Sequence, residues 1–495
     1  MLFELDGQGA RYRQICRAVL QAIQAGRLPS GRRLPSSRRL AKELGCARNL
    51  ALLAYEQLVI EGYLRTTSRG GTFVAPDLKF PSAPVRHGGA PMRLRGSAPL
   101  SDRGRRVVAS VRRALPVTAG IRQSPVDFAL GQFKPDVRMK RAMARTASAV
   151  IRQEQLGYGD ARGLRRLREL IAERLQAARG LNCTPEQIIV TTGTQQSLDL
   201  CARLLLDEGD HAVVEDPGYE SARAAFSAAG AKVLSATVGA EGMTVPAPAP
   251  RRGRIRLAYV TSSHQMPLGV TMSVARRQAL LAWARRARAI IIEDDYDGEM
   301  LYHGRPLKAL AALDSGCDRV IYSGCFAKSL APALRLAYLA VPDALAGALS
   351  DIKWLADRGS PPIIQQLVTR LMENGEYDRH LARMRRRYAH HQAVLTQALA
   401  DQLGDHVDIA GGTGGTHIVV RFNRLTDRTL KALVEECTRR GVGVYALTRY
   451  ATRPLQRPGI LLGFGLLESE EIKHGVSAIA AAYRHSVNLI RRTRT

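Results

Sequence analysis

The amino-acid sequence predicts two structural parts, a small helical domain with a β-hairpin and a large α/β domain built around a mainly parallel sheet. The first 75 residues hold three segments with helical apolar spacing, followed by two short strand-like segments. Between residues 188 and 341, seven apolar strand-like segments alternate with helical stretches, which is typical of a sheet covered by helices on both faces. An apolar content of 45% over 495 residues supplies enough side chains for more than one core.

The composition favours a cytoplasmic protein with a polyanionic partner. A net charge of +29 and a pI near 10.5 indicate nucleic acid as the simplest such partner, although a genomic bias toward arginine is an alternative source of part of this charge. The seven cysteines are scattered without a Cys-x-x-Cys pair or a Cys/His cluster, which indicates free thiols in a reducing compartment and no metal site. The sequence has no signal-peptide pattern and no run of 18 apolar residues, so we expect neither export nor a membrane span.

The first two helices are predicted from apolar spacing and capping residues. A helix over residues 11–24 has an apolar residue at every fourth position, namely Ile15, Val19 and Ile23. A second, short helix over 38–44 follows Ser36 and Ser37, either of which can cap it, and it ends before Gly45.

A third helix and a hairpin complete the N-terminal domain, which we place at residues 1–76. The helix runs from about residue 47 to 61, and its expected inner face is Leu52, Tyr55 and Val59. Two strands, 63–66 and 72–75, flank a Ser-Arg-Gly-Gly turn and predict a β-hairpin wing. Helix, short helix, turn, helix and wing is the order of a winged helix-turn-helix, although three small helices can also be a plain bundle.

If this domain binds DNA, the third helix enters the major groove by its N-terminal end. Arg48 and Asn49 lie there, and these residue types pair bidentately with guanine and adenine respectively. Twelve Lys/Arg against five Asp/Glu in the first 75 residues give the segment the charge that a DNA-binding domain needs. The positions expected to face phosphates are Ser36, Arg38, Gly70 and Gly71.

Residues 77–126 are predicted to be a basic, flexible linker. They are rich in proline and glycine and show little periodicity, so they cannot bury enough apolar surface to fold alone. Their many arginines could add non-specific attraction to phosphates, and a solvated tether without that role is the alternative.

The large domain is expected to cover residues 127–495, with a large part at 127–358 and a smaller α+β part at 359–495. Ligands of such sheets bind outside the carboxyl ends of the strands. The strand candidates of the large part are 188–191, 212–215, 232–236, 256–261, 290–292, 320–323 and 336–341.

Polar residues follow two of these strands directly. Asp294 and Tyr296 follow strand 290–292, and Lys328 follows strand 320–323 among apolar neighbours. An amine removed from water becomes a nucleophile that can form a Schiff base, and an aspartate nearby is the partner that a pyridinium nitrogen needs. The alternative is a solvated lysine in an ordinary loop.

A third strand, 188–191, is followed by Thr-Gly-Thr-Gln-Gln at the start of a helix. Small residues there expose free N–H groups at the positive end of the helix dipole, which is a natural phosphate site. An ordinary capped helix is the alternative.

These motifs together resemble the MocR/GabR family, in which a GntR-type winged helix-turn-helix is fused to a fold-type I aminotransferase-like domain. The resemblance covers nearly all of the chain. It is carried by LPSSRRLAKELG, RNLALLAYEQLVIEGYL and SRGGTFV in the first part, and by EDDYDGE and SLAPALRL in the second.

The resemblance implies pyridoxal 5'-phosphate as the cofactor and a role for each matching residue. Lys328 would form the Schiff base, Asp294 would pair with the ring nitrogen, and Tyr296 would contact the ring oxygen. Tyr219, in EDPGY, would stack on the ring, and Tyr158 would reach the phosphate of the partner subunit, which implies a homodimer. The residues expected at the phosphate are Gly193, Thr194, Gln195, Ser323 and Arg335.

Three positions depart from the aminotransferase pattern. Met266 precedes Pro267 where aminotransferases carry an asparagine, which MocR-type proteins also lack, and the role of neighbouring His264 is left open. Cys325 takes the place of a hydroxyl residue that usually binds phosphate. The run 461–464 lacks the arginine that binds a substrate carboxylate, for which the candidates are Arg449, Arg453 and Arg457.

We therefore expect a DNA-binding transcriptional regulator that senses an amino compound, or the cofactor itself, through Lys328, with weak or absent transaminase activity. One alternative is an active aminotransferase that carries a DNA-binding domain. Another is a regulator whose large domain is a scaffold without cofactor.

Overall fold

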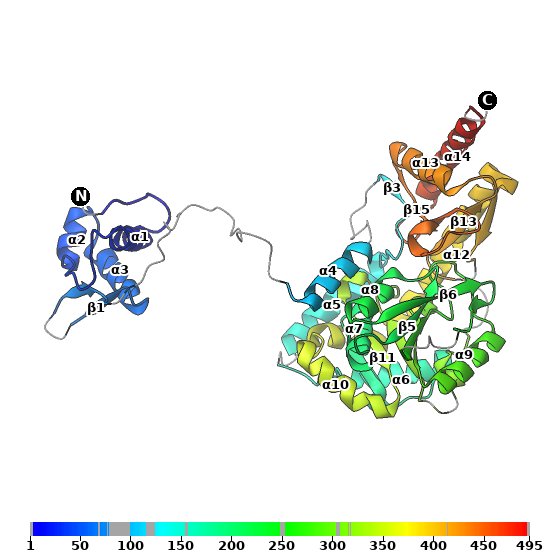
Figure 1. The fold of residues 1–495 in the computed structure, drawn as a ribbon, viewed down its shortest axis with the longest axis horizontal. Helices are drawn as coiled ribbons and strands as arrows, with labels where there is room; N and C mark the ends of the chain where they lie inside the picture. Colours follow the sequence, from blue (N-terminus) through cyan, green and yellow to red (C-terminus); the bar gives the residue numbers. More distant parts are fainter. Residues whose placement is uncertain are drawn as a thin grey trace. The chain divides into compact units, whose positions relative to one another are not determined.

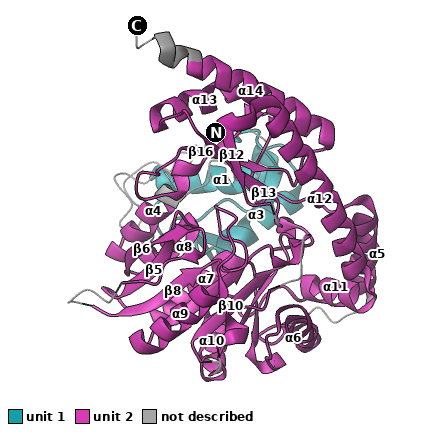
Figure 2. Cartoon of the chain, turned by 90° about the vertical axis from the view of Figure 1, so that its right-hand side faces the viewer, with its two compact units in different colours: residues 1–98 teal, residues 99–495 magenta. Residues whose placement is uncertain are grey.

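The computed structural model describes residues 3–67, 70–76, 78, 100–114, 124–153, 157–247, 253–302, 307–314, 316, 318–412 and 414–492. The chain divides into two compact units, residues 1–98 and 99–495 (Figures 1 and 2). Of the predicted linker, residues 77, 79–99 and 115–123 lie outside the described residues.

The N-terminal unit is a three-helix domain with a two-stranded wing. Ile15, Val19 and Ile23 of the first helix are buried, as their spacing predicts. The wing strands are antiparallel, with Arg65 opposite Phe73. The elements are α1 (Arg11–Gln24), α2 (Ser37–Glu43), α3 (Arg48–Ile60), β1 (Leu64–Thr66) and β2 (Thr72–Val74).

The predicted inner face of α3 is wrong at one position. Leu52 is 41% exposed, and the buried side of the helix is formed by Ala51, Ala54, Tyr55 and Leu58. Two alanines face the neighbouring helices, where a larger side chain would hold the helices apart. A pattern based on large apolar residues alone therefore includes Leu52 in the inner face and misses the two alanines.

Part of the predicted flexible linker is a helix. α4 (Asp102–Ala114) packs against α8 (Glu220–Ala228), and Arg106 forms an ion pair of 2.8 Å with Glu208. The less exposed side of α4 carries Gly104, Arg106 and Ser110, while its valines are exposed. Small and polar residues make the contact, so apolar periodicity did not reveal it.

The large unit is built on an eight-stranded sheet with the order β4-β11-β10-β9-β8-β5-β6-β7. The central strands from β10 to β6 are parallel, β11 is antiparallel to both of its neighbours, and β7 is antiparallel to β6. All seven predicted strands are present, and the mainly parallel fold is confirmed. The strands are β4 (Ile188–Thr191), β5 (His211–Asp216), β6 (Lys232–Gly239), β7 (Gly242–Met243), β8 (Ile255–Val260), β9 (Ile290–Asp295), β10 (Val320–Cys325) and β11 (Ala337–Ala340).

Helices cover both faces of this sheet, as the ribbon shows (Figure 1). Alternate residues of each strand point to opposite faces, so Ile291 and Ile292 belong to two different apolar clusters. Burial on both faces explains why the strands read as continuous apolar runs. The helices of this part are α4, α5 (Val137–Gln153), α6 (Arg165–Arg179), α7 (Thr194–Leu205), α8, α9 (Val274–Ala287), α10 (Asp343–Asp357) and α11 (Pro362–Glu373).

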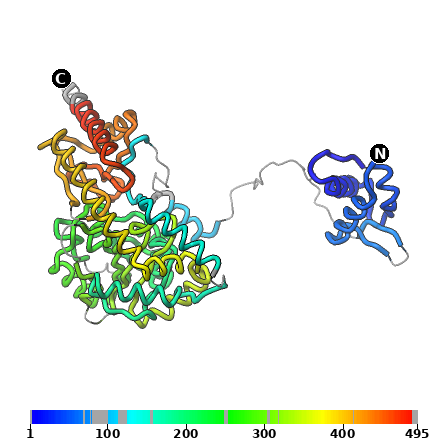
Figure 3. Tube along the Cα trace, turned by 180° about the vertical axis from the view of Figure 1, so that it is seen from behind, coloured from blue at the N-terminus to red at the C-terminus, as the bar shows by residue number. Residues whose placement is uncertain are grey.

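The C-terminal part has its own antiparallel sheet, order β12-β13-β16-β15, covered by long helices (Figure 3). A parallel pair of β3 (Val126–Asp127) and β14 (Val442–Gly443) ties the start of the domain to this part. Its other elements are α12 (Glu376–Leu403), β12 (Val407–Ala410), β13 (His417–Phe422), α13 (Asp427–Arg439), β15 (Tyr445–Ala446), β16 (Gly459–Gly463) and α14 (Ser469–Arg492).

Short 3-10 helices occur at turns of the large unit: Pro185–Gln187, Gly298–Met300, Ala311–Leu313, Pro332–Leu334, Gly404–His406 and Leu447–Tyr450. None of the helices in the described part of the chain is long and apolar enough to pass through a lipid bilayer.

Candidate functional site

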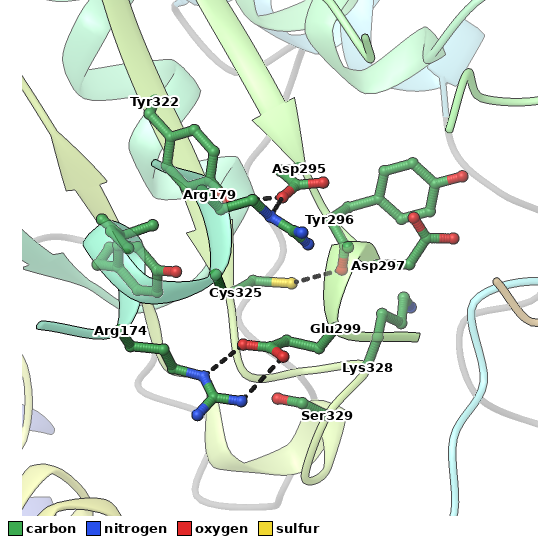
Figure 4. Close-up of a pocket in the computed structure, with 14 residues that line it drawn as sticks. Arg174, Arg179, Asp295, Tyr296, Asp297, Glu299, Tyr322, Cys325, Lys328 and Ser329 are labelled. Carbon is green, nitrogen blue, oxygen red and sulfur yellow. Dashed lines mark hydrogen bonds and ion pairs between the residues drawn. The ribbon is translucent and has the colours of Figure 1, made fainter. Parts of the chain in front are cut away.

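The ends of β9 and β10 bring the predicted lysine and aspartate close together. The two strands are parallel neighbours, with Ser323 opposite Asp294. Lys328 follows β10 and is close enough to Asp294 for their charges to interact. Lys328, Tyr296 and Cys325 also line a pocket together with residues of α6 (Figure 4).

Lys328 is held by the backbone of a distant segment. Its amine donates a hydrogen bond to the carbonyl of Gly131, and a Cβ on Gly131 would lie 2.8 Å from the amine nitrogen. Burial lowers the pKa of Lys328, although Cys325, Asp297 and Asp294 oppose the shift. The lysine is therefore more easily deprotonated, and more nucleophilic, than a solvated one.

Asp294 is buried and has one free acceptor. Its Oδ2 accepts a hydrogen bond of 2.7 Å from the hydroxyl of Tyr259, while its Oδ1 has no hydrogen-bond partner. Burial, with Asp295 and Asp297 nearby, raises the pKa of Asp294 to about 7, against the lowering effects of Tyr259 and Lys328. A buried acid with an open oxygen is suited to a cationic N–H donor.

Tyr219 lies beside this aspartate, just before α8. Its ring is stacked against that of Tyr259, with centroids 6.3 Å apart and planes inclined by 29°. Burial raises the pKa of Tyr219, and both Asp294 and Arg335 act on its charge. The tyrosine therefore lies within reach of both the acidic and the basic end of the site.

The start of α7 and Arg335 form the basic end. Gly193 has φ of +127°, and a Cβ added to it would lie 2.9 Å from Nη2 of Arg335. Thr194 and Gln195 are the first residues of α7. Ser323 Oγ is fully buried without a hydrogen-bond partner. The backbone N–H groups of the helix start and the guanidinium of Arg335 thus come together, which is the arrangement that a phosphate requires.

Tyr296 is joined to a histidine and an acid that the sequence did not assign. Its hydroxyl lies 3.1 Å from Nδ1 of His264, and the same Nδ1 lies 2.7 Å from Oδ2 of Asp297. Cys325, expected near the phosphate, instead donates from its thiol to the carbonyl of Tyr296, at 3.3 Å.

The remaining predicted residues lie outside this cluster. Tyr158 is 92% exposed, and no described contact joins it to the site. Arg457 is ion-paired with Asp408, which leaves Arg449 and Arg453 as candidates for a carboxylate. Leu461 is buried in an apolar cluster with Leu268 and Leu447.

In the N-terminal unit, the predicted DNA-facing residues lie at the start of α3, at the start of α2 and in the wing. Arg48 and Asn49 are exposed in the first turn of α3, and Arg38 is exposed on α2. Ser36 accepts a hydrogen bond from the backbone N–H of Arg39 and so caps α2. Gly70 and Gly71 form the wing turn, with φ of +79° and +133°.

Sequence reasoning missed Tyr259, Asp297 and Gly131. Tyr259 is at the end of β8, next to β9 in the sheet. Ligands of such sheets bind outside the carboxyl ends of the strands, and this criterion, which identified Asp294, could also have identified Tyr259. Asp297 belongs to the quoted EDDYDGE motif but received no role. Nothing local marks Gly131, which meets Lys328 only through the fold.

The residues present fit pyridoxal phosphate. The free Oδ1 of Asp294 supplies the acceptor for a ring nitrogen, and Arg335 with the start of α7 supplies the donors for a phosphate. The buried amine of Lys328 supplies the nucleophile. These three requirements are met at the ends of β4, β9 and β10, which lie on the same edge of the sheet.

Two family models match the chain. The model of bacterial regulatory proteins, gntR family, matches residues 11–74, and that of aminotransferase class I and II matches residues 124–473. The chain is 34% identical to the probable rhizopine catabolism regulatory protein MocR of Rhizobium meliloti, covering 98% of this chain and 96% of that protein. It is 35% identical to the HTH-type transcriptional regulator TauR of Rhodobacter capsulatus, covering 83% and 84%.

A third relative is the HTH-type pyridoxine biosynthesis transcriptional regulator PdxR of Corynebacterium glutamicum, 31% identical over 95% of each chain. Among solved structures, LysN, the α-aminoadipate aminotransferase of Thermus thermophilus, matches with a TM-score of 0.67 at 26% identity. The match covers 79% of this chain and 98% of LysN, which was solved with N-(5'-phosphopyridoxyl)-L-leucine.

Proposed function

Since the chain belongs to the MocR-type transcriptional regulators, with a GntR-family DNA-binding domain ahead of an aminotransferase-like domain, we propose that it senses an amino compound or pyridoxal phosphate at Lys328. Pyridoxal 5'-phosphate is the cofactor of this domain. The observation that carries the proposal is the free Oδ1 of buried Asp294, whose carboxyl group lies close enough to the Lys328 amine for their charges to interact.

In this proposal, one group of residues binds the ring of the cofactor and another binds its phosphate. Lys328 binds the cofactor covalently, Asp294 pairs with the ring nitrogen, and Tyr219 and Tyr296 contact the ring. The phosphate is held by Gly193, Thr194, Gln195, Ser323 and Arg335. When bound, the cofactor supplies an aldehyde carbon that reacts with primary amines. The chain's own part is to bind it, to exclude water and to bury the Lys328 amine, which makes that amine easier to deprotonate.

The DNA-binding domain responds to ligand binding at Lys328 by a change in its affinity for DNA. Arg48 and Asn49 contact bases, while Ser36, Arg38, Gly70 and Gly71 contact phosphates. We propose a homodimer in the cytoplasm, with Tyr158 of each subunit reaching the cofactor phosphate of the other, so that two winged domains bind paired half-sites. A ligand must favour one arrangement of the dimer by about 1–3 kcal/mol to change DNA affinity about 5–150-fold.

An active aminotransferase with a DNA-binding domain is the second candidate, and the intact set of Lys328, Asp294 and Tyr219 favours it. Two features argue against it: Met266 stands where aminotransferases carry an asparagine, and the run 461–464 lacks the arginine that binds a substrate carboxylate. Steady conversion of an amino acid to its oxo acid would be its signature.

One experiment separates the candidates. The full chain is mixed with pyridoxal phosphate, its visible spectrum is recorded, and borohydride is used to fix any Schiff base. DNA selected by the protein from a random pool is then titrated with and without a panel of amines. We expect a visible band, labelling at Lys328, and an amine-dependent change of DNA affinity without sustained turnover.

Two variants serve as controls. Lys328→Ala should lose the band, the label and the amine response, while DNA binding without amine persists. Lys134→Ala removes a lysine close to Gly131 in sequence and should behave as the wild type. Turnover without any change of DNA affinity would establish the enzyme instead.

A further inference from the structure

His264 lies on the loop that follows β8 and is almost fully buried. Its Nδ1 is 2.7 Å from Oδ2 of Asp297 and 3.1 Å from the hydroxyl of Tyr296. The side chains of His264 and Asp297 are only 8% and 3% exposed. Tyr296, Asp297 and Lys328 lie on the same side of the pocket (Figure 4).

The backbone of two loops fixes the histidine and the acid. A Cβ on Gly415 would lie 2.4 Å from Cε1 of His264 and 2.7 Å from Oδ2 of Asp297. A Cβ on Gly269 would lie 3.1 Å from Nε2 of His264. Both glycines have positive φ, +77° and +68°, which permits this close approach. The imidazole is therefore clamped with its Nδ1 toward Asp297.

Neighbouring titratable groups set the pKa of His264. Burial lowers the pKa of His264, but Asp297 outweighs that effect and the pKa is raised. The other groups that act on His264 are Asp295, Tyr296 and His417. Burial lowers the pKa of His417 to about 4, so that ring is neutral near neutral pH.

Asp297 also acts on the lysine directly. The titratable groups that face Lys328 are Cys325, Asp297, Asp294 and His417. Burial raises the pKa of Tyr296, and Asp297, which hydrogen bonds to its phenol, raises it further. One carboxylate thus contacts the histidine and the tyrosine and faces the amine.

We propose that His264 is a positioning residue: by donating from Nδ1 it holds the Asp297 carboxylate against Tyr296 and keeps a negative charge facing the Lys328 nitrogen. A buried carboxylate that loses its hydrogen-bond donor holds its charge at a higher cost in free energy. The Lys328 nitrogen then loses a stabilising negative charge, and it gives up its proton at lower pH. The inference rests on the proposed function, because its readout is the cofactor bound at Lys328.

The test uses two substitutions of similar size that place an amide nitrogen differently. The amide nitrogen of asparagine occupies the position of histidine Nδ1, whereas that of glutamine reaches the position of Nε2. Full-length His264→Asn and His264→Gln are loaded with pyridoxal phosphate, and the visible band is recorded as a function of pH. The midpoint is the pH at which the band is halfway through its change. We expect His264→Asn to keep the wild-type midpoint and His264→Gln to lower the midpoint by about one pH unit.

Asp297→Asn should lower the midpoint at least as far, since it removes the charge itself. Adding His264→Gln to Asp297→Asn should produce no further shift, because the histidine acts through the acid. His417→Gln is the matched control. It replaces a second buried histidine whose ring centroid is 5.3 Å from that of His264, but whose Nε2 is 3.1 Å from the carbonyl of Pro267. Its midpoint should equal that of the wild type.

The outcomes separate the two proposals. A midpoint of His264→Gln equal to that of the wild type, or equal shifts for His264→Gln and His264→Asn, would overturn the role of His264 alone. A wild-type chain that forms no visible band would overturn the cofactor site together with this inference. Far-UV circular dichroism and thermal unfolding show which variants are folded. If His264→Gln does not fold, His264→Ala takes its place, because it also removes the Nδ1 donor to Asp297. A wild-type midpoint in that variant would overturn the role of His264.

Discussion

At the scale of residues, the site depends on groups that the fold keeps in unfavourable surroundings. Asp294 is buried with one carboxylate oxygen free of hydrogen bonds. Gly193 has a positive φ, which favours glycine, and it packs closely against the guanidinium of Arg335. Both features lower the free energy of unfolding of the cofactor-free protein. Binding of a cationic ring at Asp294 and of a phosphate at Arg335 compensates for this loss.

Asp294→Asn tests the first feature through pH. In the cofactor-free protein the pKa of Asp294 is raised from 3.8 to about 7, so the folded chain keeps this proton after the unfolded chain has lost it. The resulting contribution lowers the free energy of unfolding as pH rises from about 4 to 7, by up to about 4 kcal/mol. Asp294→Asn should flatten that decline in thermal unfolding measured from about pH 5 to 8.

Two comparisons make this measurement specific. The pKa of Glu215 is also raised to about 7 by burial, so some decline should remain in Asp294→Asn. Asp199→Asn removes an exposed acid that is paired with Arg203 and serves as the control, in which the decline should persist. Asp294→Asn should also weaken cofactor binding, and an unaltered dissociation constant would contradict the assigned role.

Gly193→Ala tests the second feature. The added Cβ would lie 2.9 Å from Nη2 of Arg335 and would require a strained φ of +127°. We expect at least about a tenfold loss of cofactor affinity, or about 1.4 kcal/mol, measured by equilibrium titration of the visible band. Gly209→Ala is the matched control, because φ is +90° there but no atom lies within 4 Å. Equal losses in both variants would mean that Gly193 does not hold the phosphate.

At the scale of elements, the first turn of α3 and the wing are the proposed DNA-reading surface. Arg48 and Asn49 are exposed at the start of α3, and Leu52 and Leu53 are exposed one turn later. The exposed leucines are positioned to contact thymine methyl groups if the helix lies in the major groove. The buried side of α3 carries alanines, which allows the helices of this small domain to approach closely.

Arg48→Ala and Asn49→Ala should each cost about 1–3 kcal/mol of affinity for the selected DNA, with relaxed preference at one base pair each. Competition binding with single-base variants of the site measures both effects. Arg13→Ala on α1 removes a charge that interacts locally with Tyr12, and it serves as the control. A uniform loss for all sequences would indicate that Arg48 contacts phosphate instead of a base.

At the scale of the whole molecule, the proposed regulator must link amine binding to DNA binding. Thermodynamic linkage requires that an amine which changes DNA affinity by a given factor has its own affinity changed by DNA by the same factor. This reciprocity does not depend on the path by which the two units communicate.

We therefore expect equal factors from two titrations, of DNA with and without amine and of amine with and without DNA. The expected factor is about 5–150, which corresponds to about 1–3 kcal/mol. Lys328→Ala should reduce both factors to one. A change of DNA affinity without the reciprocal change in amine affinity would mean that the amine acts elsewhere, for example on the oligomeric state.

The sequence by itself determined the order of the elements, the strands of the sheet, and the residues Asp294, Lys328 and Gly193 at strand ends. These features depend on local patterns, such as apolar spacing, capping and glycine positions, which can be read within about ten residues. The folding of α4 was missed because small and polar residues make its contact with α8.

Only the tertiary structure decided which groups surround these residues. Tyr259 bonds to Asp294 across 35 positions of the chain, and Gly131 accepts from Lys328 across 197. His264, Asp297 and Gly415 come together from separate loops. Such contacts depend on strand register and on the packing of the large and C-terminal parts, which no local pattern specifies.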